Sequence, residues 1–398
     1  MDYNIVYFAL VSSNFGGVEQ KIIAQFDALQ ALKAKIKLFL ISSYAPGESF
    51  AFEIEKRPGV TILINSPEKV KNPWARRKEK FDLISSVLLD YDPKNTIIYF
   101  RYPSSDLLFH RFLKKNMVFK FVTEHQEVEN KLRLGLLTNT FKEDIFDFAY
   151  GTSVRKIITG FVGVSSQYLE NQISYLKRNI RSKKHFLING NGIDTAKFSI
   201  RNYPFFEGQT LKLLFVGSGY KNQGLHRLLI SMEDYYSNNF KVRIIVHVAG
   251  ITLEKTYLKK YLRNTTVRES VVFHGFLPPN EIDHLANVCH IAINSLSVHI
   301  LGQKITSTLK SREYFARGMP FITSSSDDDF DDKNPYILKV SEDENPFDIH
   351  ELINFASKLN DDPKHPQKMR QYAISHLDWS VKMKRLLTFY EKIIKDID

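Results

Sequence analysis

The chain has 398 residues, a length that predicts two domains of roughly 150–200 residues rather than one. Hydrophobic residues make up 43% of the chain, enough for sizeable cores. Its single cysteine, Cys289, excludes an intramolecular disulfide and a cysteine-based zinc site, and it fits a reducing compartment. The formal charge of +11 indicates an anionic partner (nucleic acid, a phosphorylated small molecule or an anionic membrane surface) or simply a basic, soluble surface.

Some classes of protein are disfavoured by the absence of their signatures. No RNP-type signature, zinc finger or basic zipper repeat is present, so nucleic acid is the weakest of the three anionic partners. The apolar run at the start of the chain lacks the preceding basic segment and the cleavage site of a signal peptide. No stretch of about 18 apolar residues predicts a membrane span.

The first half of the chain alternates short apolar runs with helical patterns. Residues 4–11 predict a buried strand, residues 20–35 a helix and residues 36–41 a second strand. A strand, a glycine turn, a helix and a strand form the repeating unit of a parallel, doubly wound sheet. Further strands are predicted at residues 60–64, 95–102, 119–122, 161–164 and 186–188.

A helix is predicted over residues 72–90, and its beginning is strongly basic. Trp74 accompanies the cations there, which are Lys71, Arg76, Arg77, Lys78 and Lys80. Such a helix start is able to lie on anionic lipid, although a solvated helix face has the same composition.

The pattern starts again after a polar segment, residues 201–210, which we interpret as a linker. Strands are predicted at residues 211–216, 243–248 and 291–296, and helices at residues 225–236 and 281–288. We therefore expect two Rossmann-like domains that face each other across a cleft, an α/β fold. The expected domains are residues 1–200 and 211–378, and residues 379–398 are expected to form one final helix.

Residues 308–322 predict a short helix that ends at Gly318 and feeds a buried strand. Lys310 and Glu313 share one face near the beginning of this helix. A helix N-terminus attracts phosphate, and a carboxylate one turn further is able to accept hydrogen bonds from both ribose hydroxyls. The turn is thus a candidate site for a nucleoside diphosphate, unless Lys310 and Glu313 are an ordinary surface pair.

Other motifs are weaker. Gly16 and Gly17 follow the first strand, where glycine lets backbone amides approach an anion, although a plain tight turn is an equal possibility. His125 lies at the carboxyl end of a predicted strand beside Glu124, where it could orient a hydroxyl or move a proton, or belong to a surface loop rich in carboxylates. The aspartates of residues 327–332 lack the pattern of a calcium loop and predict a solvated loop.

Several nucleotide and hydrolase signatures are missing. The spacing GxGxxG is absent at Gly217, Gly219 and Gly224, and neither GxxxxGK[ST] nor GxSxG occurs, so a dinucleotide oxidoreductase, a P-loop nucleotidase and a serine hydrolase are not supported. Five segments do follow one another in a specific order: GFVGVSSQYLE, HFLINGNGIDTAKF, LKLLFVGS with KNQGL, VVFHGFLP and TLKSREYFARGMPFI.

This ordered set resembles the GT-B fold glycosyltransferases of glycosyltransferase family 4, in a branch with an LK-x-REY helix. The resemblance implies a nucleotide-sugar donor held by the C-terminal domain, retention of anomeric configuration, no essential metal and a last helix that crosses back to the N-terminal domain. It also implies that Glu313 binds the donor ribose and that His125 lies near the transferred sugar. The donor diphosphate would meet the amides of Gly16, Gly17, Gly217 and Ser218 and the helix start at Thr308 and Leu309.

The chain also departs from that family. Ile305 stands where members often carry a first glutamate, and Ser218 and Gln223 stand where they often carry an arginine and a lysine. The diphosphate would lose two cations, and we expect Lys221 and Lys310 to replace them, with Lys304 in reserve.

The resemblance therefore implies a cytoplasmic glycosyltransferase that could lie peripherally on the inner face of the cytoplasmic membrane. It would transfer a sugar from a nucleoside diphosphate, UDP favoured over GDP, to a hydroxyl of a lipid-linked or growing surface glycan, without a cofactor. His125, Lys221, Lys310 and Glu313 are the expected catalytic residues. The alternatives are another enzyme on the same fold (an epimerase or a phosphorylase), a non-catalytic glycan-binding or partner subunit, and a nucleic-acid binder.

Overall fold

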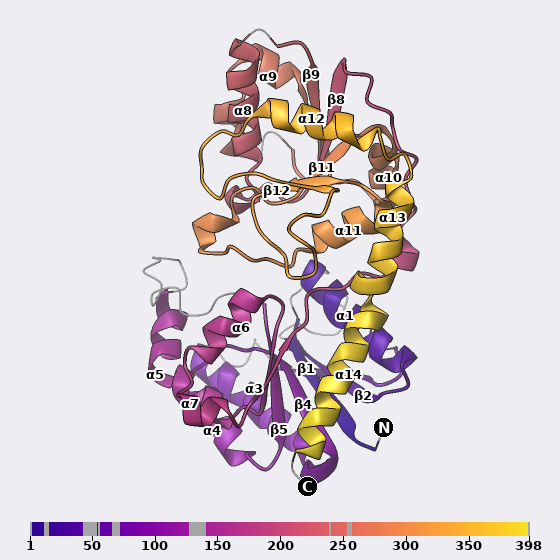
Figure 1. Ribbon diagram of the computed structural model, residues 1–398. Coiled ribbons are helices and arrows are strands. Elements are labelled where there is room, and N and C mark those ends of the chain that lie inside the picture. The colour runs from indigo at the N-terminus through magenta and orange to yellow at the C-terminus, as the bar shows by residue number, and fades with distance from the viewer. Residues whose placement is uncertain are drawn as a thin grey trace. The chain divides into compact units, whose positions relative to one another are not determined.

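The structure is a computed structural model that describes residues 2–11, 16–42, 54, 56–65, 72–126, 141–238, 240–252 and 257–396. The chain divides into two compact units (Figure 1). Unit 1 consists of Met1–Asn191 together with Trp379–Asp398, and unit 2 consists of Gly192–Asp378.

Unit 1 contains a seven-stranded, fully parallel sheet in the order β3-β2-β1-β4-β5-β6-β7. Its strands are nearly continuous apolar runs, as expected when helices cover both faces of a parallel sheet. The strands are β1 (Asn4–Leu10), β2 (Lys35–Ser42), β3 (Val60–Ile64), β4 (Thr96–Arg101), β5 (Lys120–His125), β6 (Gly160–Gly163) and β7 (His185–Ile188).

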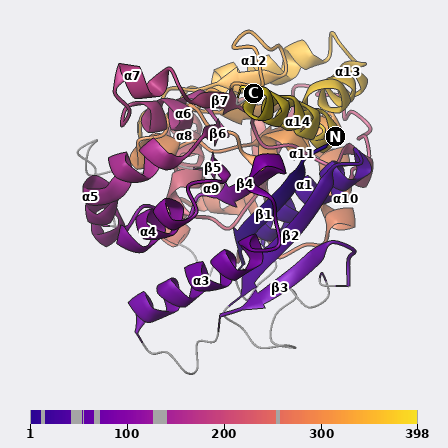
Figure 2. The ribbon, with the colours of Figure 1, turned by 90° about the horizontal axis from the view of Figure 1, so that it is seen from below.

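Helices cover the two faces of this sheet. One face packs against α1 and α14, the latter from the end of the chain, and the opposite face packs against α3, α4, α5 and α6. Figure 2 shows α14 and α3 on opposite sides of the strands. The helices of unit 1 are α1 (Gly17–Ala31), α3 (Pro73–Leu88), the short 3₁₀ turn η1 (Pro93–Asn95), α4 (Leu107–Lys115), α5 (Phe141–Ile157), α6 (Ser166–Ile173), α7 (Arg178–Arg181) and α14 (Trp379–Lys395).

Unit 2 contains a second parallel sheet, six strands in the order β10-β9-β8-β11-β12-β13. In both sheets the strand order reverses beside the first strand of the unit, the feature that places ligands at the carboxyl ends of strands in Rossmann-like domains. The strands are β8 (Thr210–Val216), β9 (Arg243–Ala249), β10 (Val271–Gly275), β11 (Ile291–Ile293), β12 (Phe321–Thr323) and β13 (Ile337–Lys339).

Helices α8, α9 and α12 pack on one face of this sheet, and α10, α11 and α13 pack on the other. The pair of Rossmann-like domains that the sequence predicts is thereby confirmed. The helices are α8 (Leu225–Ser237), α9 (Thr265–Glu269), α10 (Pro279–Val288), α11 (Leu309–Arg317), α12 (Ile349–Leu359) and α13 (His365–Tyr372), a π-helical turn η8 (Ala373–Leu377), and the 3₁₀ turns η3 (Thr195–Lys197), η4 (Lys221–Gln223), η6 (Tyr257–Tyr261) and η7 (Val298–Leu301).

The segment interpreted as a linker, residues 201–210, is packed within unit 2, and the division between the units lies at Asn191 and Gly192 instead of residue 200. Arg201 is 3% exposed, and its guanidinium donates to the carbonyls of Gly318 at 3.0 Å and Cys289 at 2.8 Å. A polar composition suggested exposure, but these buried carbonyls need a donor, and Arg201 supplies it. Among the described residues, no helix combines the length and the apolarity needed to cross a bilayer.

Candidate functional site

Helix α11 begins and ends where the sequence predicts. Thr308 is the N-cap residue, and its hydroxyl accepts a hydrogen bond from the backbone N–H of Ser311 at 3.3 Å. Gly318 ends the helix with a φ of 72°, a left-handed conformation that favours glycine, and the chain continues into β12. The amides of the first turn, at Leu309 and Lys310, have no partner inside the helix and make its beginning positive.

Lys310 is the unusual residue of this turn. Its ammonium nitrogen is buried and has no hydrogen-bond partner among the described residues, and it lies 5.0 Å from the ring centroid of Phe215 on β8. Burial lowers the pKa of Lys310 to about 8, and the charge of Glu313 acts in the opposite direction without offsetting this shift. A buried ammonium without a hydrogen-bond partner is costly, so Lys310 is a candidate contact for an anionic ligand.

Glu313 pairs with Arg317 and not with Lys310. The Arg317 Nη1 atom lies 3.3 Å from Glu313 Oε2, and the Arg317 Nε atom donates to Asp283 at 2.7 Å. Burial raises the pKa of Glu313, although Arg317 and Lys310 both act to lower it. The alternative of a surface pair between Lys310 and Glu313 is therefore wrong, because each has a different environment.

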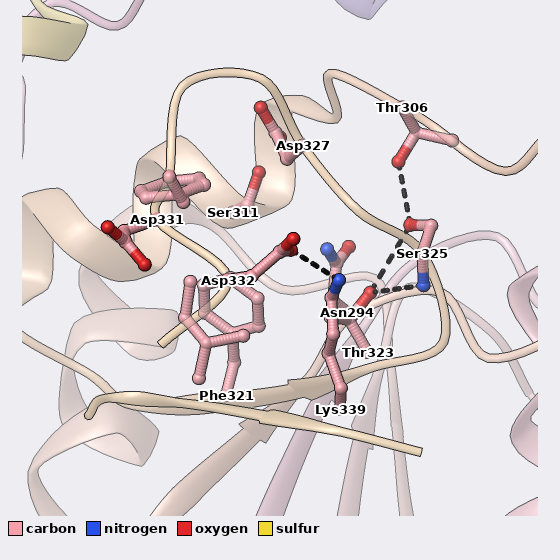
Figure 3. Close-up of a pocket in the computed structure, with 12 residues that line it drawn as sticks. Asn294, Thr306, Ser311, Phe321, Thr323, Ser325, Asp327, Asp331, Asp332 and Lys339 are labelled. Atoms are coloured by element: carbon pink, nitrogen blue, oxygen red, sulfur yellow. Dashed lines mark hydrogen bonds and ion pairs between the residues drawn. The ribbon is translucent and has the colours of Figure 1, made fainter. Parts of the chain in front are cut away.

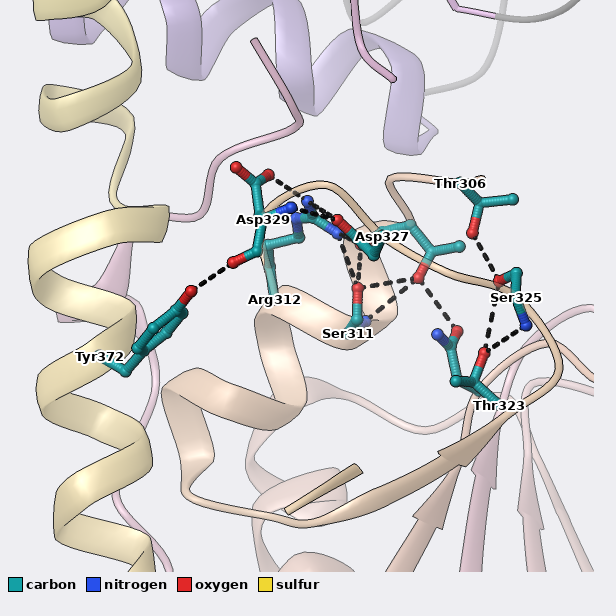
Figure 4. Close-up of polar contacts among 10 residues, drawn as sticks. Thr306, Ser311, Arg312, Thr323, Ser325, Asp327, Asp329 and Tyr372 are labelled. Carbon is teal, nitrogen blue, oxygen red and sulfur yellow. Dashed lines mark hydrogen bonds and ion pairs between the residues drawn. The ribbon is translucent and has the colours of Figure 1, made fainter. Parts of the chain in front are cut away.

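The first turn of α11 is held from behind by Arg312, which is completely buried (Figure 4). Its guanidinium forms ion pairs with Asp327 and Asp329, donates to Asp327 Oδ1 at 2.9 Å and also donates to the Ser311 hydroxyl at 2.9 Å. Burial lowers the pKa of Arg312, but the two carboxylates more than offset this and raise it above its ordinary value. We call Arg312, Asp327 and Asp329 the Arg312 clamp. The solvated loop expected for residues 327–332 is thus wrong for Asp327 and Asp329.

A small polar pocket lies beside the Arg312 clamp (Figure 3). Hydroxyl groups of Thr306, Thr323 and Ser325 meet there, and Lys339 pairs with Asp332 at its rim, at 2.5 Å. The pocket offers about 20 Å³, room for about one water molecule and not for a sugar ring. In the part of the chain that the structure describes, no group of three or more His, Cys, Asp or Glu side chains is arranged to hold a metal ion.

The loop after β8 is closed by Gln223. The Gln223 amide oxygen accepts from the Gly219 N–H at 2.9 Å, and its nitrogen lies 3.4 Å from the Ser218 hydroxyl. A Cβ on Gly217 would lie 2.6 Å from the same amide oxygen, so a larger residue there would push the Gln223 side chain away. Ser218 and Gln223, the two residues that stand where cations were expected, therefore contact each other, while Lys221 is exposed on η4.

In unit 1, α1 begins with Gly16 as its N-cap residue. The Gly16 N–H already donates to the Glu19 carboxylate at 3.0 Å, and the Glu19 side chain is buried. A phosphate at this amide would have to displace a carboxylate of the same charge. Gly17 is exposed at the first position of the helix.

His125 is fully buried at the carboxyl end of β5, which contradicts the alternative of a surface loop. Its Nε2 atom lies 2.9 Å from the Thr123 hydroxyl, and its ring centroid lies 4.3 Å from that of Tyr102. The carboxylates expected beyond it, Glu127 and Glu129, lie outside the described residues.

A buried network joins the end of β5 to α1, and sequence reasoning missed it. Lys21 Nζ lies 3.0 Å from the Glu124 carboxylate and donates to Gln126 at 2.8 Å, and the Gln25 amide donates to Glu124 at 2.8 Å. Burial acts to raise the pKa of Glu124, but Lys21 and Gln25 outweigh it and the pKa is lowered. Lys21 sits at an ordinary helical position, so no local signal marks it.

Comparisons with known proteins agree with this architecture. The family model of glycosyl transferases group 1 matches residues 197–376, nearly all of unit 2. A search of curated proteins finds no match.

Solved structures match over almost the whole chain. Sucrose-phosphate synthase from Thermosynechococcus elongatus has a TM-score of 0.68 at 13% identity, with 99% of this chain and 100% of that chain covered. A glycosyltransferase from Rickettsia africae has a TM-score of 0.68 at 16% identity, with 99% of each chain covered. The lipopolysaccharide outer core galactosyltransferase WaaB has a TM-score of 0.67 at 13% identity, covering 98% of this chain and 99% of that chain.

At such low identity the structural matches show the fold, and the family match adds the class of the C-terminal unit. The chain therefore has the GT-B fold of two Rossmann-like domains, and its C-terminal unit belongs to glycosyl transferases group 1.

Proposed function

We propose that the chain is a retaining glycosyltransferase that moves a sugar from a nucleoside-diphosphate sugar, UDP favoured over GDP, to a hydroxyl of a lipid-linked or growing surface glycan. The family of the C-terminal unit supports the reaction class. The likeness to a lipopolysaccharide galactosyltransferase supports a surface glycan as acceptor. The cytoplasmic face of a membrane, where lipid-linked acceptors are built, is the proposed location.

One observation carries the proposal: the buried ammonium of Lys310 at the beginning of α11, without a described partner. A diphosphate there would neutralise Lys310 and accept hydrogen bonds from the first amides of the helix. Glu313, one turn further along, would accept hydrogen bonds from the ribose hydroxyls, since Arg317 contacts only its Oε2 atom. Lys221 is the proposed second cation, from an exposed position on η4.

Retention without an enzymic nucleophile requires the acceptor hydroxyl to attack on the face that the diphosphate leaves. The leaving phosphate would take the proton of that hydroxyl, and Lys310 and Lys221 would stabilise the charge that develops on its oxygens without a metal ion. His125, Gly16 and Gly17 remain the proposed contacts on unit 1, to the transferred sugar and to the diphosphate. The Arg312 clamp would fix the turn that carries Lys310 and Glu313.

The experiment is a thermal-shift panel of UDP- and GDP-sugars, followed by an assay for slow donor hydrolysis. Charge-assisted hydrogen bonds are worth about 1.5–3 kcal/mol, so Glu313→Ala and Lys310→Met should each weaken donor binding roughly 10- to 100-fold. Glu342→Ala, which removes an exposed carboxylate elsewhere in unit 2, is the matched control and should change nothing. If no nucleotide raises the melting temperature at millimolar concentration, the proposal is wrong.

A non-catalytic, glycan-binding subunit is the second candidate, and two observations favour it. Ser218 and Gln223 contact each other where two cations were expected, and Glu19 occupies the amide of Gly16. This candidate predicts that glycans, but no nucleotide sugar, stabilise the protein. Donor hydrolysis that is lost in Lys310→Met would exclude it.

A further inference from the structure

The positive charge of the chain is concentrated in two segments that are far apart in sequence. Residues 177–188 and 379–396 together carry ten lysines and arginines and only two carboxylates, a net charge of +8 out of the total of +11. The sequence indicated either an anionic partner or a basic, soluble surface, and it did not locate the charge, because neither segment is exceptional alone.

The fold brings the two segments together in unit 1. Strand β7 is the edge strand of the seven-stranded sheet, and α14 packs beside it, with α7 just before it in the chain (Figure 2). A groove runs between β7 and α14, and Leu187 and Phe389 are among its apolar lining. Its cationic lining comes from both elements: Lys184, His185, Lys384, Arg385 and Lys392.

Helix α14 is amphipathic in a way that leaves one row of cations outward. Its buried residues, Met383, Leu386 and Tyr390 among them, pack into the core of unit 1, while Lys384, Arg385 and Lys392 are exposed. Within the described part of the chain, none of these three cations forms an ion pair, and the one pair in the groove joins His185 to Asp396 at 3.6 Å.

The basic start of α3, where the sequence suggested a lipid contact, differs in this respect. Arg77 forms an ion pair with Asp106, and Lys78 forms one with Asp82 at 3.0 Å. Trp74 packs its ring edge-on against Phe146, with centroids 5.1 Å apart. Carboxylates of the protein itself thus neutralise part of the charge there, and the surface of β7, α7 and α14 is the stronger electrostatic site.

We propose that this surface, which we call the β7–α14 face, docks on the anionic headgroups of a membrane. The face consists of Arg178, Arg181, Lys184, His185, Lys384, Arg385 and Lys392. Four to eight cations on an amphipathic helix or beside it bind anionic bilayers, with about a tenfold gain for every one to two charges.

The composition of the face favours a bilayer over a nucleic acid. None of the large aromatic side chains that the described residues leave exposed belongs to the face, and lysine, a point charge, outnumbers arginine in the groove. Ile188 on β7 is 42% exposed, and among the described residues it is the only large apolar side chain of α7, β7 and α14 that is exposed. Binding through this face therefore rests on charge without insertion, and it weakens steeply as salt is added. The inference names the surface through which the protein would reach the membrane location proposed above, and it does not depend on the proposed reaction.

Co-sedimentation of the full chain with vesicles tests the inference. Vesicles of equal parts phosphatidylglycerol and phosphatidylcholine should bind it at low salt, and pure phosphatidylcholine vesicles should not. The triple variant Lys384→Glu, Arg385→Glu and Lys392→Glu should lose about 100-fold in affinity or more, because three favourable charges are reversed.

The matched control carries the same charge change on exposed positions of α3 and α4: Lys78→Glu, Lys114→Glu and Lys115→Glu. It should lose less than about tenfold, the effect of net charge alone. Equal losses in both variants, or no binding of the wild type to phosphatidylglycerol vesicles, would overturn the inference. So would binding of soluble polyphosphate through the same face without binding of vesicles. Far-UV circular dichroism and donor thermal shifts check that the variants are folded.

Discussion

Lys310→Met should make the protein more stable while it removes donor binding. The pKa of Lys310 is lowered from 10.5 to about 8, a difference of about 2.5 units. At 1.36 kcal/mol per unit, keeping the buried ammonium charged costs about 3 kcal/mol at pH 7. Methionine has a similar shape and no charge, and it loses only the contact with the Phe215 ring, worth about 0.5–2 kcal/mol. We therefore expect a net gain of about 1–3 kcal/mol.

The pH dependence of this gain identifies its cause. Below pH 8 the lysine is protonated in both the folded and the unfolded chain, so the wild type bears the full cost. Between pH 8 and 10.5 the unfolded chain holds a proton that the folded chain has lost, and the stability of the wild type rises relative to that of the variant. The advantage of Lys310→Met should therefore shrink across this range.

Urea unfolding at pH 7 and near pH 10 measures both quantities, with Lys221→Met as the control. Lys221 is exposed, so its replacement should change the free energy of unfolding by less than about 0.5 kcal/mol at either pH. A variant at position 310 that is no more stable than the wild type at pH 7, or whose advantage stays constant with pH, would refute the reasoning.

Three further outcomes follow from the buried charges. At pH 8.5, UDP binding should take up a fraction of a proton, because an adjacent diphosphate raises the pKa of Lys310. Calorimetry in buffers of different ionisation enthalpy measures this uptake. If no proton is taken up, Lys310 does not contact the diphosphate. Arg312→Met should destabilise unit 2 by about 3–5 kcal/mol in urea unfolding, because two carboxylates lose their partner, and adding Asp327→Leu should recover part of that loss; additive losses would contradict the clamp. Lys21→Met should reverse the acid response of unit 1. The wild type loses the stabilisation from Glu124 as pH falls below about 4.5. In the variant Glu124 stays buried and keeps its hydrogen bond from Gln25 but loses the charge of Lys21, so the protein should be weakest near pH 7 and gain stability as acid protonates Glu124. Parallel pH profiles of the two proteins would argue against this.

The parallel strands were predictable because strands buried on both faces are continuous apolar runs. Residues 36–41 and 211–216 are examples, and both lie in strands, β2 and β8. Helix α5 is absent from the elements that the sequence predicts, because the helical periodicity of residues 141–157 is weak. Tertiary contacts stabilise such a helix, and these contacts are not encoded within the segment itself.

The site was predictable only in its local part. Spacing placed Lys310 and Glu313 on the same helix turn. It did not show that the ammonium of Lys310 is buried without a described partner, or that the carboxylate of Glu313 pairs with Arg317. The aspartates at residues 327–329 were interpreted as solvated because a run of acids usually is. The burial of Asp327 and Asp329 depends on Arg312, fifteen or more residues earlier, and no periodicity links positions so far apart.

The place of α14 in unit 1 has a consequence for the synthesis of the chain. The core of unit 1 includes Trp379, Leu386 and Tyr390, although every strand of that unit has been made by residue 188. Unit 2, by contrast, is one uninterrupted stretch. On the ribosome, unit 2 can fold as soon as it emerges, while the older N-terminal sheet has to wait with the α14 side of its core uncovered until translation is nearly finished. A chain that ends at residue 378 and has been released from the ribosome should therefore bind chaperones through its first 191 residues and resist proteolysis only in unit 2.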